Sequence, residues 1–354
     1  MRRQLKPLHE QVIVVTGASS GIGLTIACRA AAAGAAVVLA ARNEEALDTI
    51  CQGIRDSGGR CETVVADVGE LADVERISEL AHQKFGGFDT WVNNAGVGAY
   101  ATLEEMALED HERLFRTNYW GVVHGSLVAL KTLKQRGGAL INMGSIVSEM
   151  PQPLLSAYAA SKHAVKGFTD SLRIELLHED APVEVTLIQP SGIDTPFGEH
   201  ALNEMGEKSQ IPPPLYAPEL VADVVLHAAQ HPTRNIVVGG VGRAMIAASR
   251  LAPALSDRLF ATVLHRALRK PGEPPRSRPP SLHRAGRDGK RHGDQGYQLR
   301  HSLYTSAMLR PGISLGVLGG VAALAMALLS PSKRGYSPPR RASTWSTKRP
   351  ALPR

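Results

Sequence analysis

The chain has 354 residues and a net charge of +7 at neutral pH; 43% of its residues are hydrophobic and only 5% are aromatic. This length accommodates one large α/β domain with extensions, or two small domains, with an interior built from Ala, Val and Leu. The three cysteines, Cys28, Cys51 and Cys61, show no C-x-x-C spacing and no accompanying histidines. We therefore expect reduced thiols in a cytosolic compartment, without a metal site or a disulfide. Residues 1–10 contain no apolar run, which argues against a cleaved secretion signal.

The positive charge is confined to the C-terminal part of the chain. Residues 1–265 contain 22 Lys and Arg against 30 Asp and Glu, a net charge of −8, whereas residues 266–354 contain 18 against 3, a net charge of +15. Such asymmetry indicates a basic arm that meets an anionic surface, either lipid or nucleic acid. The alternative is a solvated, partly disordered tail.

Short β-branched runs alternate with longer helical stretches over the first 240 residues. This alternation predicts an α/β fold in which a doubly wound parallel sheet of about seven strands is covered by helices on both faces. The predicted strands are residues 12–16, 37–41, 63–66, 90–93, 139–143, 183–188 and 236–238. The predicted helices are residues 24–33, 44–57, 71–85, 109–135 and 156–177.

A glycine-rich turn joins the first predicted strand to the first predicted helix. Its glycines follow the spacing G-x-x-x-G-x-G, and its candidate binding residues are Gly17, Ser19, Ser20, Gly21, Ile22 and Gly23. Glycine permits positive φ and a close approach of a pyrophosphate, and the helix N-terminus supplies unpaired N–H groups. Alone, such a turn is also compatible with an ordinary tight turn, but its place between the first strand and a helix predicts a dinucleotide site.

The ends of the second and third strands indicate which dinucleotide binds. An acidic residue after the second strand accepts hydrogen bonds from the ribose of NAD, but this chain has Ala41 and then Arg42. Because a guanidinium pairs with a 2′-phosphate, we predict NADP; the alternative is an exposed arginine that only ends the strand. Asp67, after the third strand, is placed to bind the adenine amino group or to cap the following helix.

A proton-transfer site is predicted on the helix at 156–177. Tyr158 and Lys162 are four residues apart and share one helix face, and Ser145 lies thirteen residues before Tyr158, near the end of a strand. A nearby ammonium lowers the pKa of a phenol, which is about 10 when free. Next to a dinucleotide site, this arrangement predicts hydride transfer to a carbonyl or from an alcohol.

With these motifs, the sequence resembles the short-chain dehydrogenases/reductases. The matching elements occur in the family's order over about residues 8–240: Thr16–Gly23, Asp67-Val68, Asn93-Asn94-Ala95-Gly96, Asn118, Ser145, Tyr158-x-x-x-Lys162 and Pro190–Pro196. The resemblance implies a Rossmann-type catalytic domain that binds NADP(H) and converts C=O to CH–OH or the reverse.

The resemblance also implies roles for single residues. Tyr158 is expected to be the general acid/base, Lys162 to hold the nicotinamide ribose, Ser145 to bind the substrate oxygen, and Asn118 to kink its helix and hold a water next to Lys162. The further cofactor contacts implied are Val68, Asn94, Ala95, Pro190, Ile193 and Thr195. Ser191 stands where the family has glycine, so nicotinamide positioning depends on whether position 191 needs an unusual φ.

The substrate region is expected in residues 195–218, which are rich in Pro and Gly and lack periodicity. A segment of this kind at the carboxyl edge of a sheet is typical of a mobile lid. Its large residues, with Tyr100 after the fourth strand, favour an apolar, lipid-like or steroid-like carbonyl; they are Phe197, Met205, Ile211, Leu215 and Tyr216.

The composition changes after Gly240, and we divide the chain accordingly. Residues 1–240 form the predicted catalytic domain and 241–269 a basic amphipathic helical extension, in which Pro253 kinks any helix. Residues 270–312 form a Pro/Gly/Arg-rich linker, 313–329 an apolar segment, and 330–354 a disordered basic tail.

The apolar segment 313–329 carries no charge. As a helix it spans about 25 Å, slightly less than the roughly 30 Å hydrocarbon core. Gly316 and Gly320 permit close helix contact in lipid, whereas the basic residues that follow oppose translocation. It is therefore either a membrane anchor, spanning or interfacial, or a helix docked on protein.

The sequence thus predicts a cytoplasmic oxidoreductase that acts on a small-molecule carbonyl or alcohol, with membrane association through its C-terminal segment as one of the two interpretations of that segment. The long helices that carry Asn118 and Tyr158 resemble those that pair subunits in the family, so we expect a homo-oligomer; nucleic acid is not an expected partner. The alternative is a non-catalytic NADP(H) sensor or a membrane-tethered scaffold.

Overall fold

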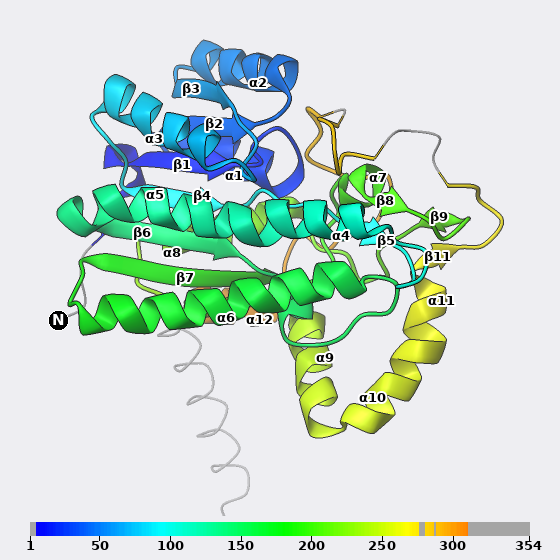
Figure 1. Ribbon diagram of the computed structural model, residues 1–354. Coiled ribbons are helices and arrows are strands. Elements are labelled where there is room, and N and C mark those ends of the chain that lie inside the picture. The colour runs from blue at the N-terminus through cyan, green and yellow to red at the C-terminus, as the bar shows by residue number, and fades with distance from the viewer. Residues whose placement is uncertain (1–4, 276–279, 287, 311–354) are drawn as a thin grey trace, which may run out of the picture. The chain divides into compact units, whose positions relative to one another are not determined.

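The structure is a computed structural model that describes residues 5–275, 280–286 and 288–310. Its centre is a seven-stranded parallel sheet with the order β10-β7-β6-β4-β1-β2-β3 (Figure 1). The strands are β1 Val12–Thr16, β2 Ala36–Ala41, β3 Arg60–Val65, β4 Thr90–Asn93, β6 Gly138–Met143, β7 Val183–Pro190 and β10 Asn235–Val238. All seven predicted strands are present. From β1 the chain adds β2 and β3 on one side and then β4, β6, β7 and β10 on the other, which confirms the doubly wound fold.

Helices cover both faces of the sheet (Figure 1). The helices that pack on one face are α1 Gly21–Ala32, α2 Glu44–Asp56 and α8 Pro218–Ala228. Those on the other face are α3 Leu71–Phe85, α5 Gly121–Arg136 and α6 Ser156–His178. Alternate residues of each strand serve the two cores: Val15 and Leu39 face the first, while Val14 and Val38 face the second. Because both faces are buried, the strands are nearly all apolar.

The predicted helix at 109–135 is interrupted. It forms α4, Leu108–Phe115, and α5, joined by a π-helical turn at Arg116–Trp120 that contains Asn118. α8 was not predicted, because its run of apolar residues resembles a buried strand as much as a helix.

Two cysteines differ from expectation. The structure joins Cys51 of α2 to Cys61 of β3 in a disulfide, with 5.5 Å between their Cα atoms, and leaves Cys28 free. The prediction that all three thiols are reduced was therefore wrong for this pair. The sequence spacing did not reveal it, because the turn after α2 folds the chain back and brings the two positions together.

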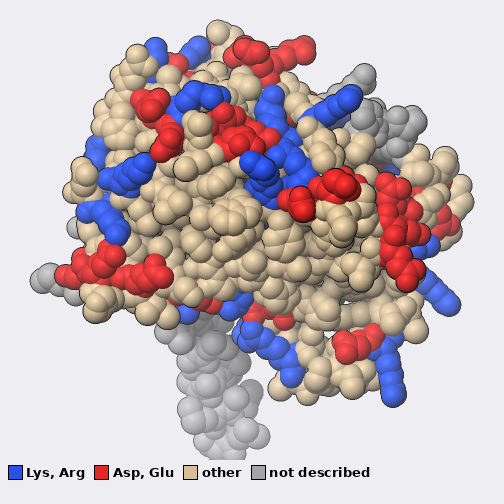
Figure 2. All heavy atoms as spheres, in the orientation of Figure 1, with Lys and Arg blue, Asp and Glu red and all other residues tan. Residues whose placement is uncertain are grey.

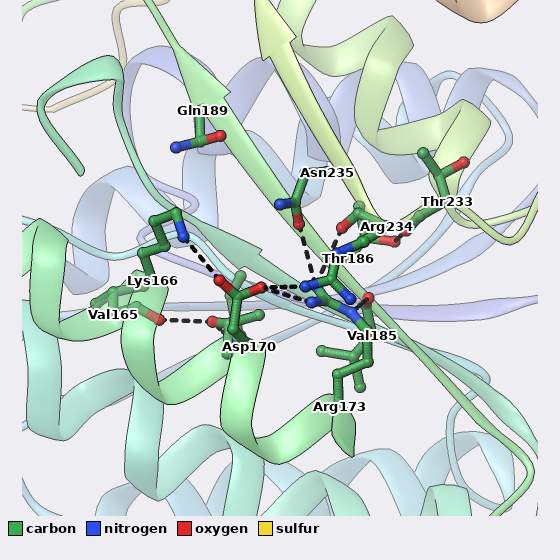
Figure 3. Close-up of polar contacts among 12 residues, drawn as sticks. Val165, Lys166, Asp170, Arg173, Val185, Thr186, Gln189, Thr233, Arg234 and Asn235 are labelled. Carbon is green, nitrogen blue, oxygen red and sulfur yellow. Dashed lines mark hydrogen bonds and ion pairs between the residues drawn. The ribbon is translucent and has the colours of Figure 1, made fainter. Parts of the chain in front are cut away.

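A partly buried polar network fixes α6 to the sheet (Figure 3). Asp170 accepts hydrogen bonds from Lys166, Arg173 and Arg234. Arg173, only 8% exposed, also donates to the carbonyl oxygen of Val185 on β7 at 3.0 Å and to the Asn235 side chain on β10 at 3.1 Å. The helix that carries Tyr158 and Lys162 is therefore held against two strands.

The chain after β7 is more ordered than its composition suggests. Residues 195–218 contain α7 Phe197–His200 and two short strands, β8 Leu202–Asn203 and β9 Lys208–Ser209, which pair with β5 Ala99–Tyr100 and β11 Arg269–Lys270. The helical extension consists of α9 Gly240–Leu251, α10 Pro253–Leu259, a π-helical turn Phe260–Leu264 and α11 His265–Ala267; α12, Leu303–Leu309, follows. Pro253 begins α10, and the extension projects beyond the edge of the sheet (Figure 1).

The predicted apolar segment 313–329 and basic tail 330–354 lie outside the described residues. Within residues 5–275, 280–286 and 288–310, no helix has the length and apolar character needed to cross a membrane.

Candidate active site

Tyr158 and Lys162 occupy the first turns of α6, on the face that looks toward the end of β6. Lys162 is 4% exposed, and its ammonium donates to the carbonyl oxygen of Met143 at 2.8 Å. Its Nζ lies 5.7 Å from the centre of the Tyr158 ring. The helix spacing thus brings the two side chains together as the sequence predicted.

Burial shifts both pKa values in the direction that disfavours the charged form of each group. It lowers the pKa of Lys162 from 10.5 to about 8. It raises the pKa of Tyr158 from 10.0 to about 12, and a hydrogen bond with Ser145 only partly opposes that increase. Without a bound cofactor the phenol therefore stays neutral. We expected the ammonium to lower the pKa of Tyr158, but the pKa is raised.

Ser145 ends the turn that follows β6. Its hydroxyl caps a short 3-10 helix, Ile146–Ser148, by accepting from the Val147 N–H at 3.3 Å, while the Ser148 hydroxyl accepts from the Ser145 N–H at 3.1 Å. This reciprocal cap fixes the backbone of Ser145 and holds its hydroxyl within reach of Tyr158.

Asn118 is fully buried in the π-helical turn. Its side chain bonds both backbone groups of Val97, accepting at 2.8 Å and donating at 3.0 Å, and donates to the Ser161 hydroxyl at 3.1 Å. Ser161 in turn donates to the carbonyl oxygen of Tyr158 at 2.7 Å. Asn118 thereby links the loop after β4 to the helix that carries the tyrosine.

The glycine-rich turn has the shape that a dinucleotide site requires. Gly17 and Gly21 have φ values of +65° and +53°. A Cβ at Gly23 would lie 2.1 Å from the carbonyl oxygen of Gly17, so only glycine fits where α1 begins. The turn also packs against Asn94, whose amide donates to the carbonyl oxygens of Thr16 and Gly17. These residues fit a bound NAD(P), with its pyrophosphate at the N-terminus of α1.

Two arginines, Arg42 and Arg113, lie beside the place where the sequence predicted the adenosine of the dinucleotide. Arg113 of α4 donates to the Asp67 carboxylate at 2.5 Å and, like Arg42, donates to the carbonyl oxygen of Leu282. Burial raises the pKa of Asp67, but the hydrogen bonds from Arg113 and the Gly69 N–H outweigh it and hold the pKa below its usual value. A hollow here is lined by residues that include the predicted Gly17, Ser19, Ser20, Arg42, Asp67, Val68 and Ala95.

The loop after β7 faces the glycine turn. Thr195 lies against Gly21, at 3.2 Å from the ideal Cβ position, so the two segments form opposite walls of the groove. Ser191 does not have a positive φ, and its hydroxyl donates to the carbonyl oxygen of Val238 at 2.6 Å. Gly239 and Gly242 leave room for its side chain. The serine at 191 therefore causes no backbone strain.

A cavity of about 540 Å³ opens beside the tyrosine. Its polar side is formed by Ser145, Tyr158 and Lys162, and the loop after β7 adds Pro190, Ile193 and Thr195. The rest of its lining is mainly apolar and includes Ile22, Tyr100, Leu155, Phe197, Ile211, Tyr216, Val241, Met245, Phe260, Val263 and Leu264. Apart from Lys162, no Lys, Arg, Asp or Glu of the described chain lines it.

Several contributing residues were not found from the sequence. Ser148 and Ser161 were not predicted, yet the Ser148 hydroxyl accepts from the Ser145 N–H and the Ser161 hydroxyl accepts from the Asn118 side chain. No sequence pattern pointed to Arg113, because its contact with Asp67 forms only when α4 packs beside the end of β3. The wall from α9 to α11 was missed because the sequence showed an amphipathic helix but not what its apolar face covers.

Comparison with known proteins agrees with this geometry. The model of the short chain dehydrogenase family matches residues 11–205. The chain is 42% identical over 330 residues to the uncharacterized oxidoreductase YxnA of Bacillus subtilis, covering 92% of each chain. It is 34% identical over 200 residues to 11-beta-hydroxysteroid dehydrogenase A of Sesamum indicum, covering 56% of this chain and 57% of that enzyme.

Solved structures show the same fold. A short chain dehydrogenase/reductase from Burkholderia phymatum in complex with NAD is similar with a TM-score of 0.65 and 26% identity, covering 71% of this chain and 96% of that one. An alcohol dehydrogenase from the archaeon Thermococcus sibiricus, complexed with 5-hydroxy-NADP, is similar with a TM-score of 0.57 and 28% identity, covering 64% and 95%. The chain belongs to the short-chain dehydrogenase/reductase family.

Proposed function

We propose that this protein is an NADP(H)-dependent oxidoreductase that interconverts a bulky, apolar ketone or aldehyde with the corresponding alcohol. The observation that carries the proposal is the cavity of about 540 Å³, in which the hydroxyls of Tyr158 and Ser145 meet an apolar wall. This volume lies within the range of about 300–1,000 Å³ that is typical of small-molecule sites.

Held by the glycine-rich turn, a dinucleotide would supply or accept the hydride. In the reducing direction Tyr158 donates its proton to the carbonyl oxygen, and Ser145 hydrogen-bonds that oxygen as negative charge develops. Lys162 provides the positive charge that stabilises the phenolate left behind. Because burial raises the pKa of Tyr158 to about 12, the phenol is neutral and carries the proton that it donates.

The choice of NADP over NAD rests on Arg42 and Arg113. Both guanidinium groups point at one oxygen, the carbonyl of Leu282, at 3.1 and 3.0 Å. Two guanidinium groups that converge on one acceptor suit a phosphate better than a ribose hydroxyl. The residue directly after β2 is Arg42, not the Asp or Glu that binds the adenosine ribose in NAD sites.

The lining of the cavity favours a neutral apolar substrate. An anionic substrate would lose its hydration without gaining a cationic partner other than Lys162, which is already bonded to Met143. The Sesamum indicum relative is named for a hydroxysteroid, and a steroid-like ketone would match both the volume and the apolar lining of the cavity here.

We also propose that the chain pairs with a second copy through α5 and α6. Large apolar side chains are exposed on these helices and the preceding turn: Trp120, Leu127, Ile174 and Leu177. The band over α5 and α6 carries few charged side chains compared with the rest of the same face (Figure 2). A face with few charges and several exposed large apolar side chains is typical of a subunit interface.

The test is consumption of NADPH and of NADH against a panel of carbonyls that pairs bulky apolar ketones with small and anionic ones. We expect turnover of the bulky apolar compounds and a preference for NADPH. Binding of dinucleotide without turnover of any carbonyl or alcohol would favour a sensor or scaffold instead.

A further inference from the structure

A stretch of the predicted linker crosses the dinucleotide groove. We call residues 281–286 and 288–293 the strap. At one end, Arg42 donates to the carbonyl oxygens of Ser281 and Leu282, and Asn43 donates to that of Gly286 at 2.8 Å. The side chain of Leu282 is fully buried among apolar residues that include Val97 and Leu114. The strap is therefore packed against the domain rather than extended into solvent.

The middle of the strap contacts the glycine-rich turn. The Gly289 N–H donates to the carbonyl oxygen of Ser19 at 2.8 Å, and the Gly21 N–H donates to the carbonyl oxygen of Lys290 at 2.8 Å. Gly21 stands at the N-terminus of α1, where a pyrophosphate would be bound. One backbone donor of that terminus is therefore already occupied by the chain's own carbonyl.

The far end of the strap contacts the opposite wall of the groove. Gly293 lies so close to Thr195 that a Cβ at this position would be 2.8 Å from the carbonyl oxygen of Thr195. Its N–H bonds the Asp194 carboxylate, and His292 lies 3.1 Å from Glu219. The strap thus reaches from the adenosine end, past the glycine turn, to the loop after β7.

The volume of the space under the strap indicates whether a dinucleotide can bind beneath the strap or only after the strap has left. The hollow between the adenosine-binding residues and Ser281, Ala285, Gly286 and Asp288 has a volume of about 90 Å³. This is well below the roughly 300 Å³ at which small-molecule sites begin. Together with the occupied donors of Arg42, Arg113 and Gly21, the volume indicates that an adenosine moiety and the strap do not fit at the same time.

We propose that the strap is an intramolecular competitor of the dinucleotide. It occupies the cofactor groove in the closed state and must leave before NADP(H) or NAD(H) binds, so cofactor affinity is reduced by the fraction of molecules that are closed. This inference rests on the proposed use of a dinucleotide but not on the choice between NADP and NAD, nor on the substrate.

A substitution at Gly289 tests the proposal with little other disturbance. Gly289 has a φ of +91°, and no atom lies within 4 Å of an added Cβ, so Gly289→Val strains only the backbone of the closed strap. Gly272→Val is the matched control, because Gly272 has a φ of +77° and equally open space, and lies in the same predicted linker but outside the lining of the hollow. We expect Gly289→Val to bind NADPH about tenfold more tightly than the wild type in a fluorescence titration, and Gly272→Val to bind as the wild type does.

A second measurement uses the unmodified protein. Lys290 and Arg291 are trypsin sites within the strap. We expect saturating NADPH to accelerate cleavage after these residues, with a small chromogenic substrate controlling for effects on trypsin itself. Two results would overturn the proposal. Slower cleavage of the strap in the presence of NADPH would show that the strap covers the bound dinucleotide. NADPH binding in Gly289→Val that is equal to or weaker than in the wild type would show that the strap does not compete. If neither the wild type nor Gly289→Val binds NADPH or NADH, the proposed function fails as well; dinucleotide binding that the substitution leaves unchanged defeats the competitor alone.

Discussion

The ammonium of Lys162 lies 5.7 Å from the centre of the Tyr158 ring and donates its hydrogen bond to the backbone of Met143 at 2.8 Å. The ammonium therefore lies over the phenol ring while its hydrogen bond is directed to the main chain. Because burial disfavours both charged forms, the protein keeps Tyr158 protonated and makes Lys162 easier to deprotonate.

Tyr158→Phe tests the acid role directly. Removal of the hydroxyl deletes the proton donor and leaves the ring in place, so we expect kcat for carbonyl reduction to fall by about 10²–10⁴ while NADPH affinity changes little. Tyr100→Phe is the matched control, since Tyr100 is a buried tyrosine that lines the same cavity. Steady-state turnover of a bulky ketone gives the comparison. Equal kcat in Tyr158→Phe and the wild type would show that another group transfers the proton.

Lys162 is predicted to reduce stability at neutral pH. Its pKa in the fold, about 8, lies below the reference value of 10.5, so the fold disfavours the charged form that the unfolded chain retains. The cost is full below pH 8 and disappears as the pH rises toward 10.5. We expect Lys162→Met to raise the free energy of unfolding by about 2 kcal/mol at pH 7, after subtracting the lost hydrogen bond. Urea denaturation at pH 7 and pH 10 measures this.

The control for that experiment is Lys131→Met, because the Lys131 side chain is 70% exposed. We expect no pH-dependent gain from it. A gain for Lys162→Met that stays the same at both pH values would mean that the extra stability comes from apolar packing rather than from removal of a buried charge.

Arg42→Asp tests the cofactor choice. A carboxylate at this position repels a 2′-phosphate and accepts hydrogen bonds from a ribose, so we expect the ratio of kcat/KM for NADPH to that for NADH to fall at least about tenfold. Arg60→Asp, on the exposed start of β3, makes the same charge change away from the groove. An unchanged ratio in Arg42→Asp would remove the argument for NADP.

The sequence predicted the parts of this site that depend on local spacing. Tyr158 and Lys162 meet because they are four residues apart on one helix, and the glycine turn is set by steric limits within the chain. Contacts between distant segments were not predictable in this way. Arg113 reaches Asp67 from 46 residues away, and Leu282 inserts beside Leu114 from a region whose composition is typical of a linker. Their partners become neighbours only when the sheet and its helices are assembled.

Asp170→Ala tests how α6 is held in place. Asp170 accepts from three basic side chains, and its loss leaves the buried guanidinium of Arg173 without a counter-charge (Figure 3). We expect a loss of about 3 kcal/mol in the free energy of unfolding at pH 7. Burial raises the pKa of Asp170, but the hydrogen bonds from Lys166 and Arg173 outweigh it and lower the pKa below 3.8. The difference between the wild type and Asp170→Ala should therefore shrink as the pH falls below 3.8.

Glu75→Ala provides the comparison, because Glu75 pairs with the exposed Lys131. We expect it to change the free energy of unfolding by less than about 0.5 kcal/mol. If Asp170→Ala has an effect as small as that of Glu75→Ala, the network in Figure 3 does not hold the helix.

Leu127→Glu tests the proposed pairing through α5 and α6. Leu127 is 54% exposed on α5, so a carboxylate there would be buried without a partner at a subunit interface formed by this helix. We expect light scattering to give a multiple of the 37.8 kDa chain mass for the wild type and a single-chain mass for Leu127→Glu. Leu251→Glu is the control, because Leu251 is 86% exposed at the end of α9 and outside α5 and α6. A single-chain mass for the wild type at all concentrations, or an unchanged assembly in Leu127→Glu, would show that this face does not pair subunits.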